Sequence, residues 1–405
     1  MDHIITNYRR LLKQLAVPYQ RKWYSDFSLE HRMTGIVGGR GVGKTTFLLD
    51  FLRKNYGESE KALYISADDL YFSSHSLVEV ATQFHDQQAG ELLVIDEIHR
   101  YTGWDQELKN IYDFFPRMKI LFSGSSSIDL IKGRYDLSRR AVLRHLHGFS
   151  FREFLEFKTG KQFPALSLND LKNPHRRFHI ADTLYQTPKL LGYLKSYLKE
   201  GYYPLFTETR NYEAYRDLLM SIIDKTIYED ISSFYSLKTS SLDIFKKILS
   251  FISCSDPGSI NINKLAKSLR KDHTTLSNYL EMLRETKLLR YLINDRHGHA
   301  LIRNAEKMYI DNPNLSYAIN ETIGKSTPIG TIRELFIISQ LQDAGHPVFA
   351  SKKGDLICEK SIFEIGGKNK KWDRLKKAEN HYLIKDDIVM GEKNEIPLYL
   401  FGFLS

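Results

Sequence analysis

Residues 38–46, GGRGVGKTT, have the composition and spacing of a loop that binds phosphate groups. Gly38, Gly43, Lys44 and Thr45 fit the pattern G-x-x-x-x-G-K-[ST]. Glycines let backbone N–H groups curl around phosphate oxygens, and the start of a helix adds a favourable dipole. Lys44 is expected to reach the β- and γ-phosphates, and the Thr45 hydroxyl to ligate Mg²⁺. The predicted nucleotide-binding residues of the loop are Gly38, Gly39, Arg40, Gly41, Val42, Gly43, Lys44, Thr45 and Thr46.

Two adjacent carboxylates follow the apolar run in LLVIDEIH, residues 92–99. An apolar run of this length before Asp96 and Glu97 is typical of a buried parallel strand. Asp96 is expected to hold the Mg²⁺ hydration shell. Glu97 is expected to orient and polarise an attacking water as a general base, unless it is only a solvated strand end. A carboxylate that activates water favours hydrolysis over transfer of a phosphoryl group to a substrate.

Hydroxyl and arginine side chains follow the next two apolar segments. Ser125 or Ser126, at the end of KILFSGSS, is placed to bond the γ-phosphate or the attacking water, although turn serines are often satisfied locally. A planar guanidinium suits the charge on a phosphoryl group in transfer, so at least one downstream arginine is expected to serve the phosphates. The candidates are Arg134, Arg139, Arg140 and Arg144. The predicted catalytic residues are Glu97, Lys44, Arg134 and Arg140; Ser125 joins the nucleotide-binding set, and Thr45 and Asp96 form the metal set.

Strand-like and helical segments alternate from residue 33 to about residue 150. This alternation predicts a mostly parallel sheet with helices on both faces. The strand candidates are MTGIVGG, ALYISAD, LLVIDE, KILFSGSS and AVLRHLHGFS. The sheet would bring the loop and the two carboxylates together.

The remaining chain divides into three segments with different residue patterns. Residues 151–240 are helical and rich in aromatic side chains, which predicts a helical lid and connector. Residues 243–310 give three short helices and a two-stranded tail, the outline of a winged helix. A small α/β module follows. The predicted domains are residues 1–150, 151–240, 241–325 and 326–405.

The predicted winged helix has features of a DNA-binding module. Its third helix, the presumed recognition helix, begins with small polar residues that are able to enter a major groove. They are Thr274, Thr275, Ser277 and Asn278. Basic residues that would meet phosphates are Lys264, Lys267, Arg270, Lys271, Arg284, Lys287 and Arg296. A winged helix used for packing or for protein contact is the alternative.

The last module carries acidic residues in the order found in a nuclease fold. Glu334 lies on a predicted helix, Asp355 follows, and Glu364 sits on the next strand. That fold needs a lysine two residues after the last acid, where this chain has Gly366, and Lys368 lies beyond it. The prediction is therefore a nuclease-like fold that does not cut, with an active nuclease and three unrelated carboxylates as alternatives. Its basic surface would be formed by Lys368, Lys370, Lys371, Arg374, Lys376 and Lys377.

The composition limits the class of protein without deciding it. The chain has 405 residues and a net charge of +9, which permits a nucleic-acid partner and does not require one. Its two cysteines, Cys254 and Cys358, show no metal spacing and no disulfide framework. No apolar stretch is long enough to span a bilayer, and no signal sequence is visible. A cytoplasmic location and no membrane contact are expected.

The chain resembles the AAA+ ATPases. The resemblance is carried by GGRGVGKT, LLVIDEIHRYTGWDQELKNIYD, ILFSGSSS and GRYDLSRRAVLRHLHGFSFREFLEF. The last run, with KMYIDNPNLSYAI and SIFEIGGKNK, is similar to prokaryotic ATP-binding members that have a C-terminal domain of unknown function. The resemblance implies an α/β fold with sheet order 5-1-4-3-2, ATP as nucleotide and Mg²⁺ as ion. It also places an arginine finger at Arg134 or at the Arg139–Arg140 pair.

The leading hypothesis is a Mg²⁺-ATP hydrolase whose cycle drives or switches its C-terminal modules, possibly on DNA. The alternatives are a slow nucleotide-dependent switch or scaffold that binds a protein partner, and an ATP-linked nuclease. Because such sites are often completed by a neighbouring subunit, an ATP-dependent homo-oligomer is also expected.

Overall fold

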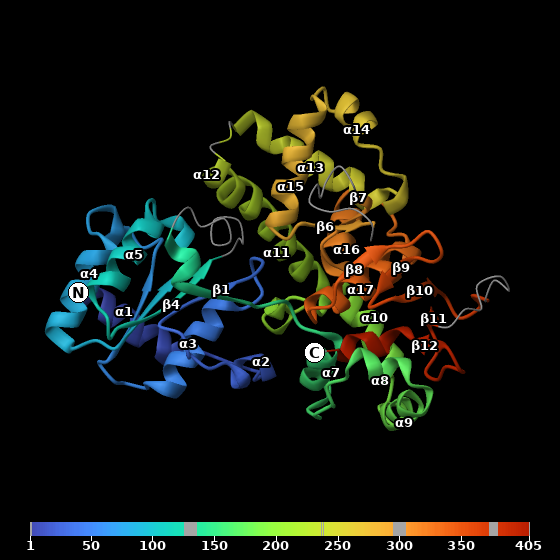
Figure 1. The fold of residues 1–405 in the computed structure, drawn as a ribbon, viewed down its shortest axis with the longest axis horizontal. Helices are drawn as coiled ribbons and strands as arrows, with labels where there is room; N and C mark the ends of the chain where they lie inside the picture. Colours follow the sequence, from blue (N-terminus) through green and yellow to red (C-terminus); the bar gives the residue numbers. More distant parts are fainter. Residues whose placement is uncertain are drawn as a thin grey trace. The chain divides into compact units, whose positions relative to one another are not determined.

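The chain folds into two compact units, Met1–Gly148 and Phe149–Ser405 (Figure 1). The computed structural model describes residues 2–124, 136–235, 237, 239–294, 305–371 and 380–404. Each unit has its own apolar core and its own main sheet.

The first unit is built on a five-stranded parallel sheet with the strand order β2-β3-β4-β1-β5. Its strands are β1 (Met33–Val37), β2 (Ala62–Ser66), β3 (Leu92–Asp96), β4 (Lys119–Gly124) and β5 (Ala141–His145). Every residue of β1 and β3 is buried, as expected for strands covered on both faces. The order is 5-1-4-3-2 read from the other edge, so the predicted fold class of this unit is confirmed.

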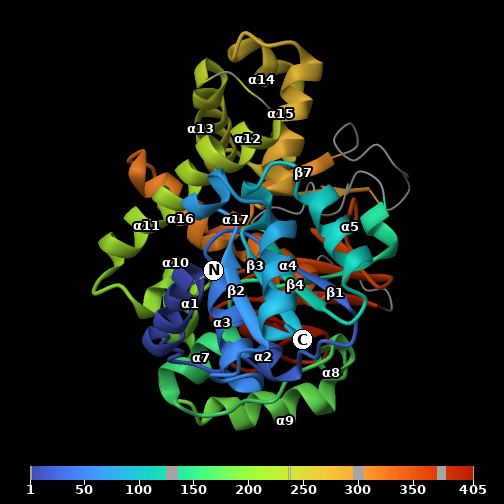
Figure 2. The ribbon, with the colours of Figure 1, turned by 90° about the vertical axis from the view of Figure 1, so that its left-hand side faces the viewer.

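Helices cover both faces of this sheet (Figures 1 and 2). They are α1 (Asp2–Gln14), α2 (Lys22–Asp26), α3 (Lys44–Asn55), α4 (Leu77–Gln88) and α5 (Trp104–Phe114). Helices α1 and α3 pack together, and α4 packs on α5. Because all the strands are parallel, the segments that follow β1, β3 and β4 emerge at one edge of the sheet. That edge is where the sequence predicts its phosphate and metal chemistry.

The second unit begins with helices and continues into a hairpin. Its helices are α7 (Phe151–Thr159), α8 (Leu168–Lys172), α9 (Pro174–Tyr185), α10 (Leu190–Glu200), α11 (Tyr212–Lys225), α12 (Ser232–Tyr235), α13 (Thr239–Cys254), α14 (Ile262–Ser268), α15 (His273–Glu285), α16 (Pro313–Thr322) and α17 (Ile329–Asp343). Strands β6 (Leu289–Ile293) and β7 (Ala305–Ile310) pair antiparallel. Helices α13 to α15 and this hairpin are the elements from which a winged helix is built.

A mixed sheet of five strands completes the second unit, in the order β12-β11-β10-β9-β8. The strands are β8 (Val348–Ala350), β9 (Leu356–Cys358), β10 (Ser361–Gly366), β11 (His381–Lys385) and β12 (Glu395–Pro397). Strands β10, β11 and β12 run parallel, while β8 and β9 pair antiparallel. Helix α17 packs on β10, so this module is the α/β arrangement that the sequence predicts.

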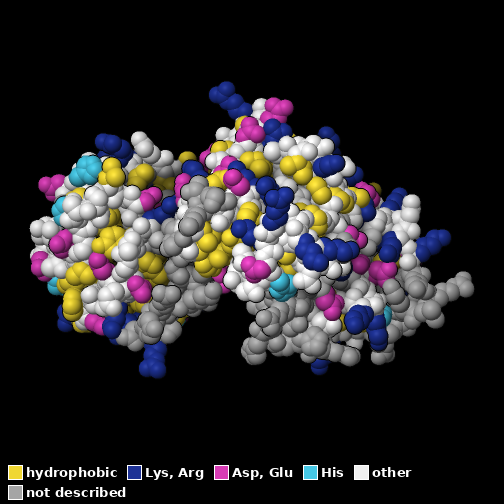
Figure 3. Space-filling view, turned by 90° about the horizontal axis from the view of Figure 1, so that it is seen from above, with side chains coloured by type: hydrophobic (Ala, Val, Ile, Leu, Met, Phe, Trp, Pro, Cys, Tyr) yellow, Lys and Arg dark blue, Asp and Glu magenta, His cyan; other side chains and the backbone are white. Residues whose placement is uncertain are grey.

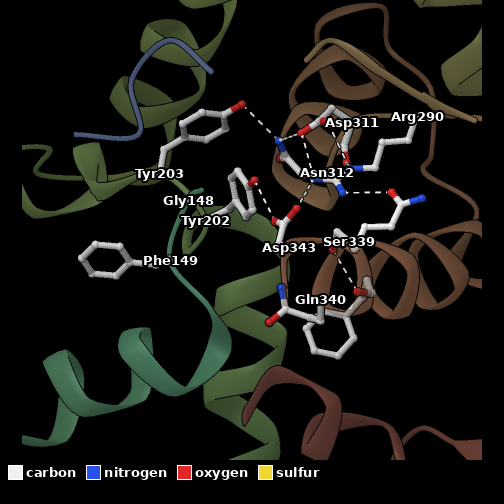
Figure 4. Close-up of polar contacts among 12 residues, drawn as sticks. Gly148, Phe149, Tyr202, Tyr203, Arg290, Asp311, Asn312, Ser339, Gln340 and Asp343 are labelled. Atoms are coloured by element: carbon white, nitrogen blue, oxygen red, sulfur yellow. Dashed lines mark hydrogen bonds and ion pairs between the residues drawn. The ribbon is translucent and has the colours of Figure 1, made fainter. Parts of the chain in front are cut away.

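A buried polar network joins the parts of the second unit (Figure 4). Arg290 on β6 lies 3.0 Å from Asp311 and 2.9 Å from Asp343 at the end of α17. Tyr202, which follows α10, donates a hydrogen bond of 3.0 Å to Asp343. Two carboxylates, together with the acceptor oxygens of Gln342 and of the Asp311 backbone, offset the cost of burying the guanidinium. The network therefore ties the hairpin, α17 and the segment after α10 to one another.

Candidate functional site

The loop between β1 and α3 has the backbone shape that its glycines predict. Gly41 and Gly43 have φ angles of 84° and 100°, a region that residues with a Cβ rarely adopt. A Cβ on Gly38 would lie 2.2 Å from the carbonyl oxygen of Leu146, so only glycine fits there. Helix α3 starts at Lys44, directly after the loop. Its first N–H groups and the loop amides are therefore available to an anion at this point.

Lys44 is folded back over this loop. Its side-chain nitrogen donates hydrogen bonds of 3.1 Å to the carbonyl oxygens of both Gly38 and Gly39. The residue is only 5% exposed. A buried ammonium held by neutral carbonyls gains from an anionic partner, because an opposite charge offsets the cost of burial better than neutral acceptors do.

Asp96, the last residue of β3, is the most heavily hydrogen-bonded carboxylate of this edge. Its Oδ2 accepts from the Thr45 hydroxyl at 2.6 Å and from the Tyr64 hydroxyl at 2.8 Å. Its Oδ1 accepts from the Ser123 hydroxyl and, at 3.1 Å, from the backbone N–H of Glu97. The structure thus brings Thr45 and Asp96, the two predicted metal ligands, into direct contact. Their hydroxyl and carboxylate oxygens are the donors that Mg²⁺ prefers.

Glu97 has a strained backbone. Its φ of 50° and ψ of 40° lie in the left-handed region, which costs a residue with a side chain about 1 kcal/mol or more. Its N–H is held by Asp96 and by the Ser123 hydroxyl, both at 3.1 Å. Its carboxylate is partly exposed and lies 3.4 Å from Nδ1 of His99, whose side chain is buried. The extended backbone of β3 therefore ends directly before Glu97.

The predicted arginines are spread over different environments. Arg140 pairs with Asp113 of α5 at 3.2 Å, and its guanidinium lies over the ring of Tyr112. Arg139 and Arg144 are exposed. Arg134, Ser125 and Ser126 lie outside the described residues, so their predicted roles remain predictions.

Two residues of this edge were missed by the sequence prediction. Ser123 lies level with Asp96, because β3 and β4 pair Ile95 with Phe122. The prediction took Ser125 or Ser126, which lie outside the described residues; Ser123 within β4 contacts the carboxylate of Asp96. The register between β3 and β4 would have identified Ser123, but this register is known only once the strand order is known. Tyr64 on β2 carried no motif at all.

The sequence prediction also missed the contacts that Arg21 makes with the loop and with the segment after β5. Arg21, which is 4% exposed, precedes α2. It donates to the carbonyl oxygens of His147 and Gly148 at 2.8 and 2.9 Å, and to that of Val42 at 3.5 Å. A buried arginine therefore links the phosphate-binding loop to the segment that leaves β5.

Helices α14 and α15 place only part of the predicted basic set at the surface. Figure 3 shows Lys and Arg side chains among apolar ones on the face seen from above. Lys264, Lys267 and Arg270 are exposed. Arg284 instead pairs with Glu281 of its own helix. Among the polar residues, Thr274 and Asn278 are exposed, Ser277 is half-buried, and Thr275 hydrogen bonds the N-cap Asp272 at 2.6 Å. Arg296 lies outside the described residues.

The three carboxylates of the C-terminal module are each held by the chain itself. Lys307 on β7 lies 2.9 Å from Glu334 and 3.8 Å from Asp355. Glu334 also accepts a hydrogen bond from Tyr309 at 2.5 Å, and Asp355 accepts one from the N–H of Ile365 at 2.7 Å.

A second lysine reaches the third carboxylate. Lys370 lies 3.0 Å from Glu364, and its stem would touch a Cβ placed on Gly366. A lysine from the following turn therefore reaches the acid that a lysine at position 366 would have reached. Within the described part of the chain, no group of three acidic, histidine or cysteine side chains is arranged to hold a metal ion. Arg374, Lys376 and Lys377 of the predicted basic surface lie outside that part.

The loop, the carboxylates after β3 and the strand order define a P-loop nucleotide-binding domain. Residues 30–155 match the sequence model of a family described as an AAA domain. The first unit is therefore an AAA+ P-loop ATPase domain. Residues 192–322 of the second unit match a domain of unknown function.

Two curated relatives come from Methanocaldococcus jannaschii, and both are described as uncharacterized. Protein MJ1637 is 27% identical over 268 residues, which cover 63% of this chain and 55% of the relative. Protein MJ1544 is 23% identical over 382 residues, which cover 91% of this chain and 77% of the relative. The chain thus spans little more than half the length of the first relative.

The chain is only weakly similar to two solved structures. AMPPCP-bound DnaA from Aquifex aeolicus is 18% identical, with a TM-score of 0.25 over 69% of this chain and 87% of that chain. PCH-2 from C. elegans is 15% identical, with a TM-score of 0.24 over 70% of this chain and 66% of that chain. Among the described helices, none combines the length and the apolar character needed to cross a membrane.

Proposed function

We propose that the first unit binds ATP with Mg²⁺ and hydrolyses it. The contact between the Thr45 hydroxyl and Asp96, 2.6 Å apart, carries this proposal. It puts two oxygen donors for a hard cation beside the loop that suits phosphate. Glu97 follows directly and supplies the base for an attacking water. Mg²⁺ would neutralise charge on the phosphate oxygens when it is bound.

The loop residues bind the phosphates of the nucleotide. The amides of residues 38–46 and the start of α3 hold the phosphates, and Lys44 moves from its carbonyl partners to the β- and γ-phosphates. An arginine, Arg134 or the Arg139–Arg140 pair, completes the site from a second copy of the chain. In this proposal the protein forms a homo-oligomer when ATP is bound.

The test is steady-state phosphate release with Mg²⁺, measured with and without single- and double-stranded DNA. Turnover that depends on Mg²⁺ and is stopped by EDTA supports hydrolysis; typical enzymes turn over about 10 times per second. Turnover below roughly one per hour, unchanged by DNA, would instead support a slow switch or scaffold that binds a protein partner.

A second role, DNA binding by the α13–α15 and β6–β7 elements, is favoured by the exposed cations around α14. Lys264, Lys267 and Arg270 lie close together in sequence beside the exposed Thr274 and Asn278 at the start of α15. Cations beside the start of such a helix suit contacts with DNA phosphates, while the exposed polar side chains at the helix start suit the groove. In this role the ATP cycle acts on a bound duplex.

The C-terminal module is proposed to keep a nuclease-like fold without cutting DNA. The position of Lys307 supports this, because its ammonium stands between Glu334 and Asp355, where a catalytic metal would have to bind. Supercoiled and linear DNA should stay intact in the presence of Mg²⁺ or Mn²⁺ and ATP. Cleavage that disappears in Asp355→Ala or Glu364→Ala would overturn this proposal and make the chain an ATP-linked nuclease.

A further inference from the structure

Tyr64 reaches the predicted metal ligand Asp96 from the neighbouring strand. In the pairing of β2 with β3, Tyr64 is opposite Val94 and Ser66 is opposite Asp96. Tyr64 is therefore a diagonal neighbour of Asp96, a separation that only a long side chain spans. Its hydroxyl donates a hydrogen bond of 2.8 Å to Oδ2 of Asp96. Phenylalanine at this position would fill the same space and leave Oδ2 without this donor.

The Tyr64 hydroxyl is a buried hydrogen-bond donor. Tyr64 is 5% exposed, and burial, followed by the charge of Asp96, raises the pKa of its hydroxyl well above the ordinary value. A neutral donor strengthens the hydrogen-bonding network of the carboxylate without adding charge beside a cation.

Tyr64 shares Oδ2 with Thr45, whereas Ser123 and the N–H of Glu97 occupy Oδ1. Donors on both oxygens restrict rotation of the carboxylate about its Cβ–Cγ bond. A ligand that is already fixed loses less conformational freedom when a metal binds. Partners of this kind commonly change metal affinity by about 10- to 100-fold when they are removed.

We propose that Tyr64 is a positioning residue for the Mg²⁺ site: its hydroxyl fixes Asp96 in the orientation that, with Thr45, receives the metal of the nucleotide complex. This inference rests on the proposed binding of Mg²⁺-ATP and adds a residue outside the nucleotide-binding motifs. It assigns Tyr64 no contact with the nucleotide. Loss of the hydroxyl should therefore weaken metal binding and leave metal-free nucleotide binding unchanged.

The chain offers a matched control in Tyr8 of α1. Its ring stacks on that of Tyr64, with centroids 6.2 Å apart and an angle of 24°. Tyr8 is also 5% exposed, and its hydroxyl has no hydrogen-bond partner in the part of the chain that the structure describes. Tyr8→Phe and Tyr64→Phe thus delete the same atom from two stacked, buried rings, and only the second deletion affects Asp96.

The experiment measures metal binding directly. Mn²⁺ is titrated into the protein with a non-hydrolysable ATP analogue, and free Mn²⁺ is followed by electron paramagnetic resonance. A fluorescent ATP analogue in EDTA gives the metal-free nucleotide affinity, and thermal unfolding checks the fold. Tyr64→Phe should weaken Mn²⁺ binding by about 10-fold, with unchanged affinity in EDTA. Tyr8→Phe should bind Mn²⁺ as the parent does.

Three results would overturn the inference. Parental Mn²⁺ affinity in Tyr64→Phe would show that the hydroxyl does not position Asp96. Equal weakening in Tyr8→Phe would assign the effect to the aromatic stack. Weakening in EDTA as well as with metal would place Tyr64 in nucleotide binding. If the parent itself shows no metal-dependent binding, the proposed function fails first and the inference fails with it. Should Tyr64→Phe unfold, Tyr64→Met provides the same comparison.

Discussion

Among single residues, Asp96 and Glu97 show how adjacent carboxylates acquire different roles. Asp96 is 2% exposed and accepts hydrogen bonds from four donors, so it is fixed. Glu97 has its N–H anchored and its backbone in the left-handed region, while its carboxylate is partly exposed. A fixed acid suits a metal, and a more accessible one suits a water.

The first prediction separates binding from hydrolysis at this site. Lys44→Ala should abolish tight ATP binding, because the ammonium that meets the phosphates is lost. Glu97→Gln should keep binding but slow hydrolysis by about 10²- to 10⁴-fold, because an amide cannot take a proton. Binding is followed with a fluorescent ATP analogue and hydrolysis by phosphate release.

The controls for this prediction change exposed residues near the same elements. Lys54→Ala lies near the end of α3, where the lysine pairs with Asp50. Glu91→Gln precedes β3, and its side chain is 61% exposed. Both should behave as the parent. Hydrolysis at the parental rate in Glu97→Gln would remove Glu97 from the role of base.

At the scale of elements, strand β7 contacts the C-terminal module through polar groups. Lys307 and Tyr309 are two residues apart on β7, so their side chains lie on the same face of the hairpin. Both reach Glu334 of α17, and Lys307 also approaches Asp355 before β9. One strand of the predicted winged helix therefore supplies the counter-charge for the predicted nuclease-like module.

The second prediction concerns how much the charge of Lys307 contributes to the stability of the chain. Lys307→Met should destabilise the chain by about 1–2 kcal/mol, because it leaves Glu334 and Asp355 with less compensation in a partly buried place. Glu334→Gln should cost less in the Lys307→Met background than in the parent, since the uncompensated charge is then removed. Urea unfolding of the four proteins gives the coupling. Simple additivity would mean that the ion pair contributes nothing.

The third prediction concerns helices α14 and α15. Lys267→Glu and Arg270→Glu should each weaken binding to any duplex and lower the slope of log K against log salt by about 1, as expected for a lost phosphate contact. Fluorescence anisotropy at several salt concentrations measures both quantities.

Lys161→Glu is the matched control, because it makes the same charge change in the exposed segment after α7. It should leave the affinity and the slope unchanged. If all three variants weaken binding equally, only the net charge of +9 attracts DNA, and the helices have no special part in it.

At the scale of the whole molecule, the proposed function takes an arginine from a second copy of the chain. Arg140 is paired with Asp113 on its own α5, so within one copy it is already engaged. An arginine from a second copy would provide positive charge during phosphoryl transfer. The molecule would then hydrolyse ATP only as an assembly.

The fourth prediction tests this assembly by mixing two inactive variants. Arg134→Ala, or the Arg139→Ala/Arg140→Ala pair, should lower turnover by about 10³- to 10⁵-fold. Mixing it with Glu97→Gln should restore part of the activity, because some interfaces then combine an intact base with an intact arginine. Phosphate release is measured together with mass by light scattering, with and without ATP.

The two variants measured alone, at the same total concentration, are the controls for the mixture. A monomer with ATP that hydrolyses at the parental rate contradicts the proposal. Activity in the mixture no higher than the sum of the two variants would place the arginine in the same copy as its base.

The sequence by itself determined the parts of the first unit that depend on local chemistry. Gly41 and Gly43 adopt positive φ angles, and a helix, α3, opens directly after the loop as predicted. The five strands follow from apolar runs, and the strand order followed from the family resemblance. These features were predictable because backbone sterics and hydrophobic pattern act over a few residues.

The tertiary structure decided which side chains meet. Tyr64 and Ser123 lie on strands that flank β3, so their contact with Asp96 depends on strand order and register, which no local pattern encodes. Lys307 reaches Glu334 across 27 positions of sequence for the same reason. Motifs record residues that are close along the chain, whereas a carboxylate is oriented by donors that are close in space.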